Sequence, residues 1–143
     1  MNADARRTLE RLVRFGHHHT VYEVVFSADG TLIVTGSGDN TVRVWDRKTL
    51  STISVLTGHA DRVWSVDISP DGRRIASASS DGTVKIWSVS TGRELVSLRG
   101  PTAWRHVRFS PDGEKLAAGS AGALVALWAA PYASLARPER SLP

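Results

Sequence analysis

Short runs of apolar residues alternate with polar residues along most of the chain, and each run ends at a turn-forming pair. The run Val63–Ile68 shows the alternation most clearly, and the pair Asp71-Gly72 follows it. Alternation with a period of two predicts a β-strand with one buried face. An Asp-Gly pair between two such runs predicts a tight hairpin turn. The pattern therefore predicts antiparallel strands.

Four such strands follow one another between residues 21 and 56, and four more follow between residues 63 and 98. The third strand of each set ends in a tryptophan. The expected strands are Val21–Phe26, Leu32–Thr35, Thr41–Trp45 and Ile53–Leu56, then Val63–Ile68, Arg74–Ser77, Thr83–Trp87 and Leu95–Leu98. An all-β protein is expected.

The pattern is an internal repeat that occurs three times. The pairs Asp29-Gly30, Asp71-Gly72 and Asp112-Gly113 lie 42 and 41 residues apart, and Trp45, Trp87 and Trp128 keep these spacings. Gly16-His17 corresponds to Gly58-His59, with Gly100-Pro101 at the third equivalent. The repeat covers about residues 8 to 129, and a period of this length is typical of propellers and other repeat architectures.

The repeated motifs resemble those of the WD-repeat β-propeller family. The second repeat, from Gly58-His59 to Trp87-Ser88, carries most of the likeness, and Trp45-Asp46 supplies the eponymous dipeptide. The resemblance implies a partial propeller of three four-stranded antiparallel blades. The expected division is a tail at 1–7, blades at 8–46, 47–88 and 89–130, and a second tail at 131–143.

The resemblance also implies a polar network of His, Ser or Thr, Asp and Trp inside each blade. Indole N–H can only donate, a carboxylate can only accept, and His and Ser can do both. The matching residues are a histidine from His17 to His19 (His17 by the repeat alignment), Thr35 (or Ser37), Asp39 and Trp45 in repeat one, and His59, Ser77 (or Ser79), Asp81 and Trp87 in repeat two. Repeat three keeps only Trp128, because Pro101, Ala118 and Gly122 stand at the other positions. We expect its blade to be the least well specified.

Closure of the propeller is a problem for three blades, since propellers typically have about four to eight and open sheet edges favour aggregation. Residues 9–15 align with the outer strand of a preceding blade, and no clear fourth strand follows Trp128. This outer strand could complete blade three of another copy, which would be a head-to-tail contact that closes a ring of two or three chains. The alternative is a piece of a longer propeller.

Residues 9–15 also permit a helical interpretation. Leu9, Leu12 and Val13 lie at helical spacing, and Asp4 could cap a helix. The repeat alignment favours a strand, which would complete a blade.

Composition and charge say less about fold and function than the repeat does. The chain of 143 residues has a net charge of +4, and much of the excess lies in the terminal segments, at Arg6, Arg7, Arg11, Arg14, Arg137 and Arg140. Weak binding of nucleic acid or anionic surfaces through these segments is an alternative function. Without cysteine there is no disulfide, thiolate metal site or thiol nucleophile. No apolar run is long enough for a membrane span, and no secretory signal is visible, so a cytoplasmic protein is expected.

Three motifs could suggest chemistry, and each has a plainer interpretation. Adjacent histidines at His17-His18-His19 alternate between strand faces, and no further ligand is spaced nearby, so no metal is expected. Ser, His and Asp recur with the blades, as a structural network would and a single active site would not. Gly36-Ser37-Gly38 lacks the ending of a phosphate loop. We expect neither catalysis nor a cofactor.

One set of residues is a candidate partner-binding face. The resemblance places Tyr22 and Trp64 on a rim that meets partners in the family, with Arg105 as the third equivalent. Aromatic and arginine side chains dominate protein-binding hot spots. The expected face is Thr20, Tyr22, Arg62, Trp64 and Arg105, and the expected function is a non-catalytic scaffold for proteins or peptides. Alternatively, Trp64 packs against a neighbouring blade, or the chain is an architectural piece of a larger propeller.

Overall fold

The computed structural model describes residues 16–130, which form eleven β-strands and no helix. Blade 1 contains β1 (Val21–Phe26), β2 (Leu32–Ser37), β3 (Val42–Asp46) and β4 (Thr52–Leu56). Blade 2 contains β5 (Val63–Ile68), β6 (Arg74–Ser79), β7 (Thr83–Ser88) and β8 (Glu94–Arg99), and blade 3 contains β9 (Trp104–Phe109), β10 (Lys115–Ser120) and β11 (Val125–Ala129). Over the same range, no helix has the length and apolar character needed to cross a membrane.

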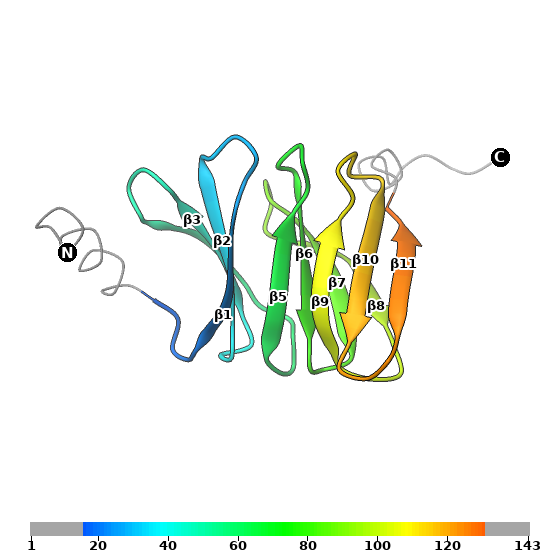
Figure 1. Ribbon diagram of the computed structural model, residues 1–143. Coiled ribbons are helices and arrows are strands. Elements are labelled where there is room, and N and C mark those ends of the chain that lie inside the picture. The colour runs from blue at the N-terminus through cyan, green and yellow to red at the C-terminus, as the bar shows by residue number, and fades with distance from the viewer. Residues whose placement is uncertain (1–15, 131–143) are drawn as a thin grey trace, which may run out of the picture.

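Each blade is an antiparallel meander whose strands follow the chain order. The three blades stand side by side, with β1, β5 and β9 next to one another (Figure 1). The all-β partial propeller expected from the sequence is confirmed. Blade 3 has three strands within residues 16–130, and the outer strand expected at 9–15 lies outside the described residues.

The first hairpin of every blade has the same turn, and its chemistry explains why the motif recurs. In blade 2 the Asp71 carboxylate accepts hydrogen bonds from the Ser69 hydroxyl at 2.7 Å and from the Arg73 N–H at 3.1 Å. Gly72 has a φ of 74°, a left-handed conformation that favours glycine. The Asp-Gly turns predicted from the sequence are therefore formed by local hydrogen bonds.

Two apolar clusters hold the blades together, one at each junction. The first joins β2, β3 and β4 of blade 1 to β5, β6 and β7 of blade 2, and Val34, Val44, Val66 and Trp87 belong to it. The second joins blade 2 to blade 3 through Ala76, Ile86, Trp104, Val107 and Leu116. The apolar core of this fold therefore lies between blades.

Arg74 adds hydrogen bonds across the second junction. Its buried guanidinium donates to the carbonyls of Ala130 and Gly113, at 2.9 and 3.0 Å, and lies over the ring of Phe109. One side chain of β6 thus satisfies two carbonyls of blade 3, which are on the far side of the junction.

Candidate functional site

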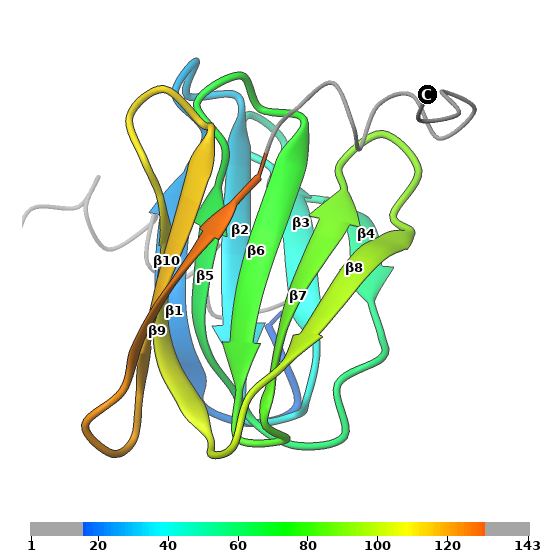
Figure 2. The ribbon, with the colours of Figure 1, turned by 90° about the vertical axis from the view of Figure 1, so that its right-hand side faces the viewer.

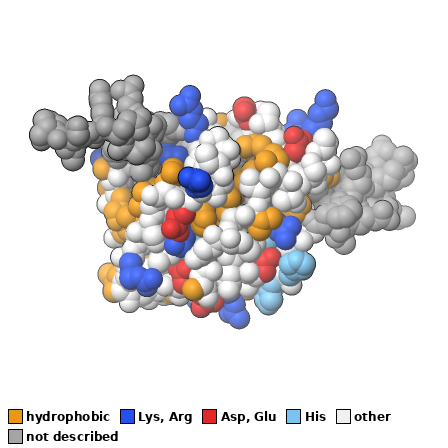
Figure 3. Space-filling view, turned by 180° about the vertical axis from the view of Figure 1, so that it is seen from behind, with side chains coloured by type: hydrophobic (Ala, Val, Ile, Leu, Met, Phe, Trp, Pro, Cys, Tyr) orange, Lys and Arg blue, Asp and Glu red, His pale blue; other side chains and the backbone are white. Residues whose placement is uncertain are grey.

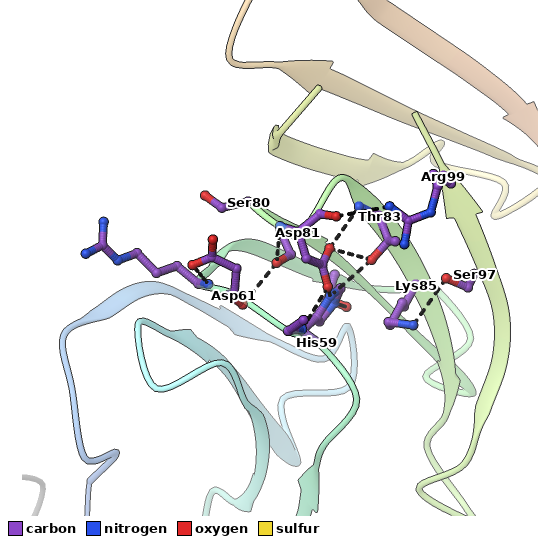
Figure 4. Close-up of polar contacts among 12 residues, drawn as sticks. His59, Asp61, Ser80, Asp81, Thr83, Lys85, Ser97 and Arg99 are labelled. Carbon is purple, nitrogen blue, oxygen red and sulfur yellow. Dashed lines mark hydrogen bonds and ion pairs between the residues drawn. The ribbon is translucent and has the colours of Figure 1, made fainter. Parts of the chain in front are cut away.

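The polar network of blade 2 runs as a single chain of hydrogen bonds through the sheet. Trp87 Nε1 donates to Ser77 Oγ at 2.8 Å, and Ser77 Oγ lies 2.7 Å from His59 Nε2. His59 Nδ1 lies 2.9 Å from Asp81 Oδ2 (Figure 4). Asp81 also accepts from the Thr83 hydroxyl at 2.6 Å. The four residues expected for this network are in contact.

With a neutral imidazole, the donors and acceptors of this chain allow only one arrangement of protons. An ionised Asp81 can only accept, so His59 Nδ1 carries the proton and donates to it. His59 Nε2 is then an acceptor and Trp87 can only donate, so the Ser77 hydroxyl accepts from Trp87 and donates its own proton to His59 Nε2. In this arrangement every polar group of the network is satisfied.

Ionisation of the two titratable groups agrees with this arrangement. Burial lowers the pKa of His59 below the usual value for histidine, although the hydrogen bond with Asp81 opposes the shift. Burial by itself raises the pKa of Asp81, but hydrogen bonds from Thr83, Ala60 and His59 hold it well below the usual value. A neutral imidazole and a carboxylate are therefore the stable forms near neutral pH.

Blade 1 repeats this network with threonine in place of serine. Trp45 Nε1 donates to Thr35 Oγ1 at 2.9 Å, and Thr35 Oγ1 lies 2.6 Å from His17 Nε2. His17 Nδ1 lies 2.9 Å from Asp39 Oδ2. Burial raises the pKa of Asp39, but hydrogen bonds from Thr41, His17 and His18 outweigh it and lower the pKa to about 2. His17 is thus the histidine of the cluster that enters the blade.

The spacing of Ser77, His59 and Asp81 resembles that of a hydrolase triad, but the serine is sealed inside the sheet. Ser77 has 0% of its surface exposed, and its oxygen already accepts the indole N–H of Trp87. A nucleophile must reach its substrate, and this hydroxyl meets no solvent. The arrangement serves to align β6, β7 and the loop that carries His59.

Blade 3 replaces the polar network with an aromatic contact. The indole of Trp104 lies 5.7 Å from that of Trp128, edge to face at 69°. In blade 2 the ring of His59 meets Trp87 in nearly the same way, at 6.0 Å and 63°. A side chain on Gly100 would collide with the indole of Trp104, so the glycine makes room for it. Trp104 therefore occupies the place that histidine takes in the other blades.

Because of the two polar networks, we expect the free energy of unfolding to fall as the solution becomes acidic. The folded pKa of His17 and His59 lies below 6.5, and that of Asp39 lies near 2, below 3.8. A lowered folded pKa contributes stability above the unfolded pKa, and this contribution is lost as the pH falls. We expect the urea midpoint to be constant above about pH 7, to fall below 6.5, and to fall again below 3.8. An equal midpoint at pH 7 and pH 5 would contradict the prediction.

The candidate partner-binding residues are brought together only in part. The ring of Tyr22 lies 4.3 Å from that of Trp64, and the guanidinium carbon of Arg105 lies 4.0 Å above the Trp64 ring. We call Tyr22, Trp64 and Arg105 the rim row. Thr20 and Arg62 are exposed, and their backbone carbonyls accept hydrogen bonds from Gly38 and Ser80. Trp64 packs against both neighbouring blades and stays partly exposed.

The three residues of the rim row share a backbone feature that the sequence did not reveal. Each is the unpaired residue of a β-bulge, because the register of β1, β5 and β9 shifts at Tyr22, Trp64 and Arg105. A bulge adds one residue to a strand and re-aims its side chain. The indole N–H of Trp64 donates to the Ser80 hydroxyl, which holds the ring in place.

Other candidate chemistry finds little support within residues 16–130. No group of three His, Cys, Asp or Glu side chains there could hold a metal ion. The backbone N–H of His18 donates to Asp39, and the ring of His19 accepts from Thr20. The arginines of the terminal segments lie outside the described residues.

Comparison with known proteins places the repeat in a family. A family model described as "WD domain, G-beta repeat" matches residues 9–46, 50–88 and 92–129. A search of curated proteins found no match.

Proposed function

The chain belongs to the family of WD domain, G-beta repeat proteins, and from this premise we propose that it is a non-catalytic scaffold that binds a protein or peptide at the rim row. Repeats of this family are generally protein-interaction scaffolds. The observation that carries the proposal is the stack of Tyr22, Trp64 and Arg105 across three blades. These are residue types that dominate hot spots of protein interfaces.

Rigid display is the mechanism that the surroundings of the rim row support. The networks behind it align the strands, and the stacked rings are already ordered, so binding loses little side-chain entropy. Arg105 makes no ion pair within the described range, and neither does the side chain of the neighbouring Arg62. A carboxylate on the partner would complement these two charges. An acidic segment is therefore the chemistry that fits.

Random peptides displayed on phage and selected on the immobilised full chain would test this function. We expect Trp64→Ala to weaken the selected peptides by about 30-fold, which corresponds to a hot-spot loss of about 2 kcal/mol. Arg105→Glu should also weaken acidic peptides.

The control is Arg93→Ala, which removes an exposed arginine away from the rim row. Its affinities should equal those of the unmodified chain, and thermal unfolding of each variant should show that it is folded. Unchanged affinity for Trp64→Ala and Arg105→Glu would place binding elsewhere and overturn the proposal.

A further inference from the structure

Two blade faces of this chain expose apolar side chains. The first is the front face of blade 1, the side turned away from blade 2, where Val24 and Phe26 are 57% and 60% exposed. The second is the rear face of blade 3, again turned away from blade 2, where Val125 and Leu127 are 84% and 67% exposed. Figure 2 looks onto this rear face, and Figure 3 shows hydrophobic side chains gathered at the edge beside the C-terminal grey residues.

The same repeat positions are buried wherever a neighbouring blade is present. On front faces, Val24 corresponds to Val66 and Phe26 to Ile68, and both equivalents are buried against blade 1. On rear faces, Val125 and Leu127 correspond to Val84 and Ile86, which are buried against blade 3. The exposed residues are therefore junction residues that no other blade of residues 16–130 covers, and the two faces are the two halves of one kind of junction.

At a junction, side chains from the front face of one blade fill the space above a small residue on the rear face of its neighbour. At the first junction, a side chain on Gly36 would lie 2.9 Å from Val63 and 3.0 Å from Val66, so two valines fill the space above glycine. Gly119 is the equivalent of Gly36 on the exposed rear face, and a side chain placed there would come no closer than 3.9 Å to another residue, His106. The exposed front face carries two valines again, because Val21 and Val24 are the equivalents of Val63 and Val66.

A second pair of positions matches by charge. At the second junction, the guanidinium of Arg74 lies 5.3 Å from the centre of the Phe109 ring. At the first junction, Leu32 stands at the position of Arg74 and Ile68 at the position of Phe109, so both residues are aliphatic. The exposed rear face has a cation, Lys115, at the Arg74 position, and the exposed front face has an aromatic ring, Phe26, at the Phe109 position. A cation over an aromatic face is a favourable contact.

We propose that the rear face of blade 3 docks on the front face of blade 1 of a second copy, and that two chains close a six-bladed ring through two such junctions. Glycine with two valines repeats the combination at the first junction, and lysine with phenylalanine repeats the second junction's combination of a cation, there Arg74, with an aromatic ring. A head-to-tail contact makes a ring when its rotation closes. Six blades lie within the usual range of about four to eight, whereas three copies would exceed it. This inference does not rest on the proposed binding at the rim row.

The solution mass of the full chain tests the ring directly. Size-exclusion chromatography with light scattering should give a single species with twice the mass of one 15.5 kDa chain. A monomer would overturn the proposal and leave the two faces to blades of a longer or different chain. A series of masses that grows with concentration would also overturn it, because an open filament is then the assembly.

Two variants locate the junction and show its polarity. Phe26→Glu blocks the front face and Leu127→Glu blocks the rear face, so each variant alone should be a monomer. Mixed in equal amounts, they should form a dimer, because the intact rear face of one meets the intact front face of the other. That recovery also shows that both variants are folded.

The matched control is Leu95→Glu. Leu95 is 40% exposed on β8, although blade 2 has a neighbour on each side, so its position does not belong to a junction. This variant should keep the mass of the unmodified dimer. A dimer that survives both Phe26→Glu and Leu127→Glu, or that Leu95→Glu abolishes as well, would overturn the assignment of the two faces.

Discussion

Replacement of Trp87 by alanine is expected to lower the free energy of unfolding by about 3–5 kcal/mol, the usual cost of removing a large buried aromatic side chain. Trp87 is among the largest fully buried side chains of residues 16–130, and it belongs to the cluster that joins blades 1 and 2. Its loss opens a cavity at that junction and removes the donor to Ser77. Urea unfolding at a fixed protein concentration measures the effect, since assembly would otherwise change the apparent stability.

Two further variants test this prediction. Trp87→Phe keeps an aromatic ring but removes the five-membered part of the indole with its N–H, so its cost should exceed the about 1 kcal/mol of a lost hydrogen bond and stay below that of Trp87→Ala. Trp128→Ala should cost less than Trp87→Ala, because Trp128 is partly exposed and blade 3 has Ala118 at the position of Ser77. Equal losses for Trp87→Ala and Trp128→Ala would contradict the view that the complete network makes blade 2 the best specified.

Replacement of Asp81 by alanine is expected to cost about 3 kcal/mol, since it leaves several donors without an acceptor in a shielded site. The carboxylate accepts from the ring of His59, from the N–H groups of Ala60 and Thr83, and from the Thr83 hydroxyl. His59 Nδ1 would lose its acceptor inside the protein, where an unpaired donor is costly. The urea midpoint at pH 7 is the measurement.

Asp61→Ala is the matched control for Asp81→Ala. Asp61 lies nearby but is exposed, and its carboxylate accepts from the backbone N–H of Arg62. Its replacement should change the free energy of unfolding by less than about 0.5 kcal/mol, as is usual for surface positions. Similar losses for the two variants would show that the carboxylate of Asp81 acts through its charge alone and not through the network.

The aromatic contact in blade 3 shows that the network has an apolar substitute. Trp104 and Trp128 meet nearly as His59 and Trp87 do, although blade 3 has neither the histidine nor the aspartate. An apolar pair of similar shape needs no partner for buried donors and acceptors, apart from the indole N–H groups. Nε1 of Trp104 is buried and has no hydrogen-bond partner within residues 16–130, which is the remaining cost of this substitution.

The amino-acid sequence by itself determined the strands, the turns and the three-fold repeat. Each of these follows from contacts that are short in sequence. Ser69, Asp71 and Gly72 form their turn within four residues, and alternation along Val63–Ile68 places one set of side chains toward a junction. The members of the polar network could be named because repetition aligned His17 with His59 and Trp45 with Trp87. For such features, local chemistry and periodicity are sufficient.

Only the tertiary structure decided which side chains contact one another between blades. The stack of Tyr22, Trp64 and Arg105 depends on three bulges and on rings that are about 40 residues apart along the chain. Alternation predicts no bulge, since a bulge breaks the period that the pattern measures. The contact of Trp104 with Trp128 joins two strands of blade 3. The hydrogen bonds of Arg74 depend on the carbonyls that it meets across a junction. Contacts across a junction join residues distant in sequence, and a single chain's pattern does not state which residues meet there.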